Sequence, residues 1–173
     1  SHILILCVSV GLISLYAWQS ARYSFDKKWV DELELQARMV SSLLPMKEGM
    51  PDLAAAEKFL HGLTVAGGNR FTLILSDGKV VGDTEADSAK LDTHINRPEV
   101  VEAIKSGRGI SKRYSSSLGM PMMYLAVRQP KDGLCRWVLR VSVPYHTLSK
   151  ELNAQYLPFL GVVAAILALA LVL

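Results

Sequence analysis

The sequence contains few cysteines and little excess charge. Its 173 residues include only two cysteines. Cys7 lies in an apolar run and Cys135 in a stretch typical of a folded domain, so we expect no disulfide between them. Cys135 is more consistent with a small buried apolar side chain than with a reactive thiol. The net charge of +3, without a basic stripe or interleaved aromatic residues, argues against nucleic acid as a partner.

The sequence also lacks the motifs by which an active site is recognised. Ser, His and Asp are all present, but there is no nucleophile elbow, no paired metal-ligand motif and no glycine-rich phosphate loop. We therefore predict that this chain does not itself catalyse a reaction and binds no cofactor.

Charge is missing from two long runs, one at each end of the chain. Ile3 to Trp18 carries no charge, and its Tyr16 and Trp18 suit a membrane–water boundary. Tyr156 to Leu173 is a second uncharged run, close to the length that spans a bilayer. We interpret residues 1–20 and 156–173 as two transmembrane helices with truncated outer ends, cut from a longer protein. Residues 21–155 then form one domain outside the membrane.

The first run continues into an amphipathic segment that ends at Leu44. A long helix of some forty residues would extend about 60 Å, enough to carry a displacement through a membrane. Leu35, Met39 and Leu43 form one apolar line on it. A second stripe recurs at intervals of three and four: Phe25, Trp29, Leu33, Ala37, Val40 and Leu44. So wide an apolar arc can pack against the core of its own domain and against a second copy of the chain. We predict that Trp29, Leu33, Val40 and Leu44 contact the second copy in a homodimer. The alternative is that both lines are core of a single monomer.

Breakers and periodicity divide the rest of the chain into short elements. Asp52 is expected to cap a helix over 53–63, and Asp77-Gly78 to join strands over 71–76 and 79–81. A polar loop over 83–96 leads to a helix from Pro98 to the Gly107 stop. Strands are expected over 110–117, 122–128 and 136–143, and a last helix over 145–156. Alternation in 136–143 predicts one buried face and one largely wet face that includes Arg140 and Ser142. This order predicts an α+β fold with a PAS-like, five-stranded antiparallel sheet.

The stretch from Asp77 to Pro130 carries several short motifs in a characteristic order. They are DGKVVGDT, His94, Asn96-Arg97-Pro98-Glu99-Val100, Ala103-Ile104 with Gly107 and Gly109, Arg113 with Ser115, and Tyr124-Leu125-Ala126-Val127. In these it resembles the extracytoplasmic sensor region of phosphate-regulon-type (PhoR-type) sensor histidine kinases. The resemblance covers under half of the chain.

The resemblance implies a PAS-like (single Cache) periplasmic domain between two helices of the bacterial inner membrane, and a homodimer. It also implies a cytoplasmic kinase core beyond Leu173 that uses ATP and Mg and phosphorylates a response regulator. No His-Glu phospho-acceptor box or ATP lid is present in this chain. The alternatives are the sensor domain of a chemoreceptor or of a cyclic-dinucleotide enzyme. A third is a ligand-free membrane interaction module with a transporter or lipoprotein as partner.

Four residues are candidates for binding a small anionic ligand: Arg97, Arg113, Tyr114 and Tyr124. The arginine fork matches a carboxylate or phosphate, and tyrosine adds a ring with a polar tip. Arg113 and Tyr114 must point to opposite faces of a strand, so at most one of them faces a given pocket. The alternative is surface arginines and core tyrosines, with Arg97 pairing Glu99. We interpret His94 as a hydrogen-bond partner in a loop rather than a pH switch.

The polar loop also brings four carboxylates into a short stretch, Asp83, Glu85, Asp87 and Asp92. Several oxygen ligands are what a hard divalent cation prefers, so the four form a candidate metal site. Their spacing does not match an EF-hand, and a solvated charged loop is the alternative.

Overall fold

A computed structural model describes residues 2–63, 68–115 and 118–145, together with residues 161, 163–165 and 168. The chain divides into two units, Ser1–Trp29 with His146–Leu173, and Val30–Tyr145. Helix α1 (His2–Leu43) contributes to both units, which confirms the long helix expected to end before Pro45. Its end is explained by Pro45, which disfavours helical geometry in the preceding residue.

The smaller unit contains the first part of α1. Phe25 and Trp29 pack edge to face with ring centroids 6.1 Å apart, and the Arg22 guanidinium lies 5.4 Å from the centre of the Trp18 ring. Within the described part of the chain, no helix has the length and apolar character needed for a membrane span. The expected span over 156–173 and the expected helix over 145–156 fall almost entirely outside the described residues.

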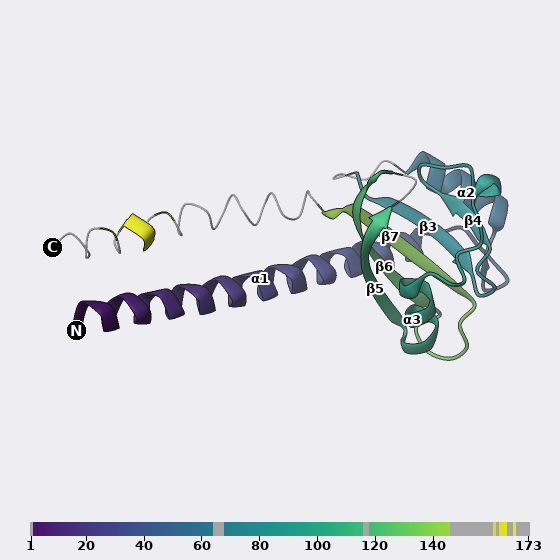
Figure 1. Ribbon diagram of the computed structural model, residues 1–173. Coiled ribbons are helices and arrows are strands. Elements are labelled where there is room, and N and C mark those ends of the chain that lie inside the picture. Colours follow the sequence, from purple (N-terminus) through teal and green to yellow (C-terminus); the bar gives the residue numbers. More distant parts are fainter. Residues whose placement is uncertain are drawn as a thin grey trace. The chain divides into compact units, whose positions relative to one another are not determined.

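The larger unit is built on the five-stranded antiparallel sheet that the sequence predicted (Figure 1). Its strands, in chain order, are β3 (Arg70–Leu75), β4 (Val80–Asp83), β5 (Arg108–Ser115), β6 (Met120–Gln129) and β7 (Trp137–Pro144). The spatial order is β4-β3-β7-β6-β5, so the last strand lies at the centre.

The short elements follow the expected signals closely. Helix α2 (Leu53–Gly62) is capped by Asp52, whose carboxylate accepts a hydrogen bond from the Ala55 backbone N–H. Helix α3 (Pro98–Ser106) begins at its proline and ends at Gly107, which has φ +93°. A 3₁₀ turn, η1 (Ser88–Lys90), lies within the polar loop. A small hairpin of β1 (Met46–Lys47) and β2 (Met50–Pro51) was not predicted, because two-residue strands leave no periodicity to detect.

One face of the sheet packs against the second half of α1. Arg108 of β5 donates a hydrogen bond to Glu34, and Asn69 donates one to Gln36, at 2.8 and 2.7 Å. Alternation places Phe71 and Leu73 of β3 on this face with matching apolar residues of β7. Helix α1 supplies the buried apolar side chains of Leu33, Ala37 and Val40 to this core, and Leu44, directly after the helix, adds a fourth.

This packing corrects the expected role of the long-helix stripe. Leu33, Val40 and Leu44 are at most 7% exposed and belong to the core of their own chain, so they are not free to contact a second copy. Trp29 is half-buried beside Phe25. The apolar line that stays open is Leu35, Met39 and Leu43, each 55 to 61% exposed. The homodimer therefore stays a prediction, without these three core residues as its contacts.

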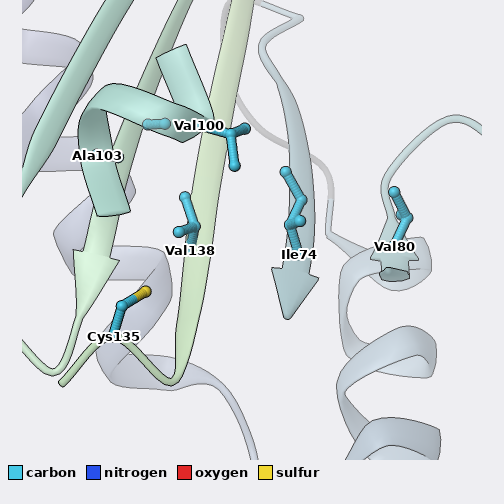
Figure 2. Close-up of a cluster of buried hydrophobic side chains, with 7 residues drawn as sticks. Ile74, Val80, Val100, Ala103, Cys135 and Val138 are labelled. Atoms are coloured by element: carbon cyan, nitrogen blue, oxygen red, sulfur yellow. The ribbon is translucent and has the colours of Figure 1, made fainter. Parts of the chain in front are cut away.

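The other face of the sheet is covered by α3 and the polar loop. Figure 2 shows its buried cluster, in which Val100 and Ala103 of α3 lie near Val138, and Ile74, Val80 and Cys135 complete the group. Cys135 is 8% exposed, as expected of an apolar side chain. Gly109 permits this contact, because a side chain there would overlap the Glu99 carbonyl.

The face of β7 that was expected to be wet is buried. Arg140 is 4% exposed and Ser142 is 2% exposed. The prediction was wrong because β7 is the central strand, so a helix covers the face that an outer strand would leave to water.

Candidate ligand-binding site

A cleft of about 200 Å³ opens on the face that α3 covers. Its lining, among the residues that the structure describes, carries five positively charged side chains and one carboxylate. The cations are Arg70, Lys90, Arg97, Arg113 and Arg140; the carboxylate is Asp92; the remainder are His94, Tyr124, Ser115, Ser142, Leu91, Leu118 and Met122. The lining therefore carries more positive than negative side chains.

Strand register assembles the floor of this cleft. Ser142 of the central strand lies opposite Arg70 of β3 and Tyr124 of β6. In the next row, Arg140 lies opposite Thr72 of β3. Residues in neighbouring rows on one face are two apart along each strand, so side chains far apart in sequence converge.

Tyr124 lies in the floor of the cleft and contacts two of its arginines. Its ring, 5% exposed, lies 4.0 Å from the Arg113 guanidinium and 5.2 Å from that of Arg140, measured to the ring centre. Both contacts are in cation–π range, which holds the two guanidinium groups on the same aromatic support.

Glu99, fully buried on the first turn of α3, balances the same two arginines. Its carboxylate accepts a hydrogen bond from the Ser111 hydroxyl at 2.7 Å and lies 3.4 Å from both Arg113 and Arg140. Burial raises the pKa of Glu99, but the bonds from Ser111 and its own backbone N–H and the two arginine charges leave that pKa below its ordinary value. Burial lowers the pKa of Arg140 to about 10, against the raising effect of Glu99. Both groups are therefore charged at neutral pH.

The two arginines keep unused donor capacity. The Nε atoms of Arg113 and Arg140 are buried, and neither has a hydrogen-bond partner among the described residues. Buried polar groups are normally satisfied in folded proteins.

Asp83, a candidate metal ligand, is a structural residue. It is fully buried and accepts hydrogen bonds from Arg70 Nε at 2.9 and 3.1 Å and from the Thr72 hydroxyl at 2.8 Å. The backbone N–H groups of Glu85 and Ala86 donate to it at 2.9 and 3.0 Å. These contacts fix the start of the polar loop against β3.

The other three candidate metal ligands do not join it. Glu85 is exposed and lies 3.9 Å from Arg70. Asp87 caps η1 by accepting from the Ala89 backbone N–H and lies 3.3 Å from Lys90. Asp92 lines the cleft. Among the described residues, no three His, Cys, Asp or Glu side chains form a group that could hold a metal ion.

The four candidate ligand-binding residues divide as strand alternation requires. Arg97, Arg113 and Tyr124 line the cleft, whereas Tyr114 is 64% exposed and lies outside its lining. Glu99 pairs with Arg113 rather than with Arg97, as far as the described contacts go.

Sequence reasoning missed three cations of the lining, Arg70, Lys90 and Arg140, and the buried Glu99 that pairs with two of the arginines. The signal available for Arg140 was Val138, an apolar residue two positions away on the face that was expected to be wet. Nothing in the local pattern distinguished Arg70 or Glu99 from surface charges.

His94 sits at the edge of the cleft as a loop hydrogen-bond partner. Its Nδ1 lies 2.7 Å from the Asp92 carbonyl oxygen, and its backbone N–H donates to the Gly78 carbonyl at 2.8 Å. Burial and the charges of Arg140 and Arg97 lower the pKa of His94, against the raising effects of the Asp92 backbone contact and Glu99. Its ring is therefore neutral at pH 7.

No protein-family model matches the chain, and no curated protein sequence matches it either. Solved structures do share its fold. The ligand-binding domain of the Campylobacter jejuni chemoreceptor Tlp3, in complex with 4-methylisoleucine, superposes with a TM-score of 0.61 at 16% identity, over 89% of this chain and 64% of that one. The ligand-binding domain of the Pseudomonas aeruginosa amino acid chemoreceptor PctC, in complex with GABA, has a TM-score of 0.52 at 14% identity, over 91% of this chain and 67% of that one. This chain thus spans just under two thirds of the Tlp3 domain.

These likenesses define the fold class. It is an α+β, Cache-like fold with a long N-terminal helix and a five-stranded antiparallel sheet. More particularly, it is the fold of chemoreceptor ligand-binding domains, and at these identities the likeness concerns the fold alone.

Proposed function

We propose that this chain is the sensing region of a bacterial membrane receptor, and that its cleft binds a small anionic ligand. The observation that carries the proposal is the lining, in which five cations face one carboxylate over the stack of Arg113, Tyr124 and Arg140. The Tlp3 domain was solved with 4-methylisoleucine and with L-valine, and the PctC domain with GABA. Each of those ligands bears a carboxylate, which supports a carboxylate-binding role for the cleft.

The arrangement suits signalling as well as binding. Arg113 and Arg140 belong to the sheet, whereas Arg97 and Lys90 belong to the connection that leads into α3. An anion held by both groups would draw that connection toward the sheet. A ligand shifts such an equilibrium only by its difference in affinity for the two arrangements, and a tenfold difference corresponds to about 1.4 kcal/mol.

For the receptor as a whole, we propose a sensor histidine kinase of the inner membrane with this domain outside the cytoplasm. The support is the sequence resemblance over Asp77–Pro130 and the uncharged runs at both ends. Such a parent would use ATP and Mg in a separate kinase core and act on a response regulator. The runner-up is a chemoreceptor, which the structural neighbours favour. A His-Glu box and an ATP lid in the residues that follow Leu173 would support the kinase, whereas a long heptad hairpin or a GGDEF run would exclude it.

The ligand proposal is tested by thermal unfolding and titration calorimetry of the whole chain in detergent micelles, with a panel of small carboxylates and orthophosphate. A ligand at one hundred times its Kd should stabilise the folded chain by about 2.7 kcal/mol. Arg113→Gln should weaken binding about tenfold or more, because a hydrogen bond to a charged group contributes roughly 1.5–3 kcal/mol.

Arg108→Gln is the matched control. Arg108 lies on the same strand and also pairs with a glutamate, Glu34, but it is not part of the cleft lining. If no small anion shifts the unfolding temperature and a second protein purifies with the chain, the ligand-free interaction module is the better interpretation.

A further inference from the structure

The buried carboxylates beside the cleft are paired with arginines of its lining. Glu99 is engaged by Ser111 and by two guanidinium groups. Asp83 is engaged by Arg70, by the Thr72 hydroxyl and by two backbone N–H groups. Neither carboxylate lines the cleft. Among the described residues, the carboxylate that does is Asp92, on an exposed part of the loop.

The positions of these carboxylates affect which anions the cleft can bind. An α-amino acid brings an ammonium group as well as a carboxylate, and a buried ammonium is costly unless a carboxylate or several carbonyl groups receive it. Apart from the exposed Asp92, the polar lining offers only uncharged acceptors to an ammonium group, such as Ser115, Ser142 and the neutral His94 ring. Asp83 and Glu99 offset part of the arginine charge, but the lining itself carries more cations than carboxylates and so disfavours a further positive charge. The site therefore penalises the ammonium end of a zwitterion.

The positive charge is also spread along the cleft. Arg113 and Arg140 share the Tyr124 support on the sheet. Lys90, the last residue of η1, and Arg97, directly before α3, come from the polar loop rather than from the sheet. A volume of about 200 Å³ is smaller than the roughly 300–1,000 Å³ of sites for drug-sized molecules. Two cationic ends across so small a space match a compact molecule with two negative charges.

We propose that the ligand is a small dianion without an ammonium group, a dicarboxylate or a phosphate. One anionic end binds Arg113 and the other Arg97. This proposal rests on the proposed ligand-sensing function and deepens it by naming the ligand class.

The test is titration calorimetry of the whole chain in detergent micelles at fixed ionic strength, since salt screens such interactions. Succinate and L-aspartate share one carbon skeleton and differ by an ammonium group. We expect succinate to bind at least tenfold more tightly. Equal or tighter binding of L-aspartate would overturn the dianion proposal and leave the sensing function intact. Absence of binding by every small anion would overturn both. Orthophosphate distinguishes the two sources of the charge: tighter binding than succinate identifies a phosphate site, and weaker binding a dicarboxylate site.

Variants separate the two ends of the ligand. Arg97→Gln should weaken succinate binding about tenfold and leave binding of the monoanion acetate unchanged, whereas Arg108→Gln should change neither. Asp92→Asn should tighten succinate binding and widen the preference for succinate over L-aspartate, because it removes less repulsion from the zwitterion. Unaltered succinate binding by Arg97→Gln would refute the second anionic end.

Discussion

The substitution Glu99→Gln removes one negative charge from a fully buried ion-pair group on α3 and changes almost no volume. In the native chain, that charge lies 3.4 Å from Arg113 and 3.4 Å from Arg140, and Arg140 is only 4% exposed. The glutamine leaves two guanidinium groups facing an amide, with little water to compensate them. The variant should therefore destabilise the fold far more than a surface charge change does.

The magnitude follows from the geometry. Removing one partner of a buried ion pair costs roughly 3–5 kcal/mol. The 3.4 Å separations are longer than the roughly 2.7–2.9 Å of strong charge-assisted bonds, and the Arg113 side chain is 26% exposed, so we take the lower end, about 3 kcal/mol. With a urea slope of about 1–3 kcal/mol per molar, the unfolding midpoint should fall by about 1–3 M.

The assay is urea unfolding of the whole chain in micelles, followed by near-ultraviolet circular dichroism. Glu102→Gln is the control, because Glu102 lies one turn further along α3 and is exposed. It should stay within about 1 kcal/mol of the unmodified chain. Adding Arg140→Met to Glu99→Gln should recover more than about 1 kcal/mol of the loss, because the uncompensated charge is gone. A loss below about 1 kcal/mol in Glu99→Gln would refute the reasoning.

Three further measurements probe the same unit. The pKa of His94 is lowered in the folded chain, so the contribution of His94 to stability is complete above its ordinary pKa of 6.5 and is lost as the pH falls. Thermal stability should therefore decline below about pH 6.5, and it should decline less in His94→Asn. Glu99 has a lowered pKa and adds a second decline below its ordinary value of 4.5, absent in Glu99→Gln. Asp52→Ala should cost about 1 kcal/mol in urea unfolding by removing the cap of α2. Gly109→Ala should weaken anion binding in calorimetry, because the new methyl group displaces α3; unchanged binding would contradict that packing.

Local chemistry explains why the elements could be predicted. Asp52, Pro98 and Gly107 mark helix ends through their own backbone and side-chain geometry, and the structure places α2 and α3 where these signals indicate. The Asp77-Gly78 turn joins β3 to β4 in the same way. Each of these signals acts over a few residues, so the sequence alone carries it.

For the long helix, local signals could not predict which face is buried. Periodicity identified two apolar lines on α1 but could not say which one faced the sheet. The structure buries Leu33 and Val40 and leaves Leu35 and Met39 exposed. Only the position of the sheet decides between them, and that position depends on contacts such as Arg108 with Glu34, 74 residues apart in sequence.

The sequence predicted Arg97, Arg113 and Tyr124 of the candidate site but not the other cations of its lining, for the same physical reason. Arg70, Arg113 and Arg140 come from three different strands, and each, taken singly, is indistinguishable from a surface arginine. They become one site because β7, the last strand, inserts between β3 and β6 and brings Arg140 beside the other two. Glu99 then reaches Arg113 and Arg140 only because Gly109 lets α3 pack closely on β5. The positive charge of the cleft is thus a property of strand order rather than of any segment. A change that kept every local element but disturbed the insertion of β7 would abolish anion binding.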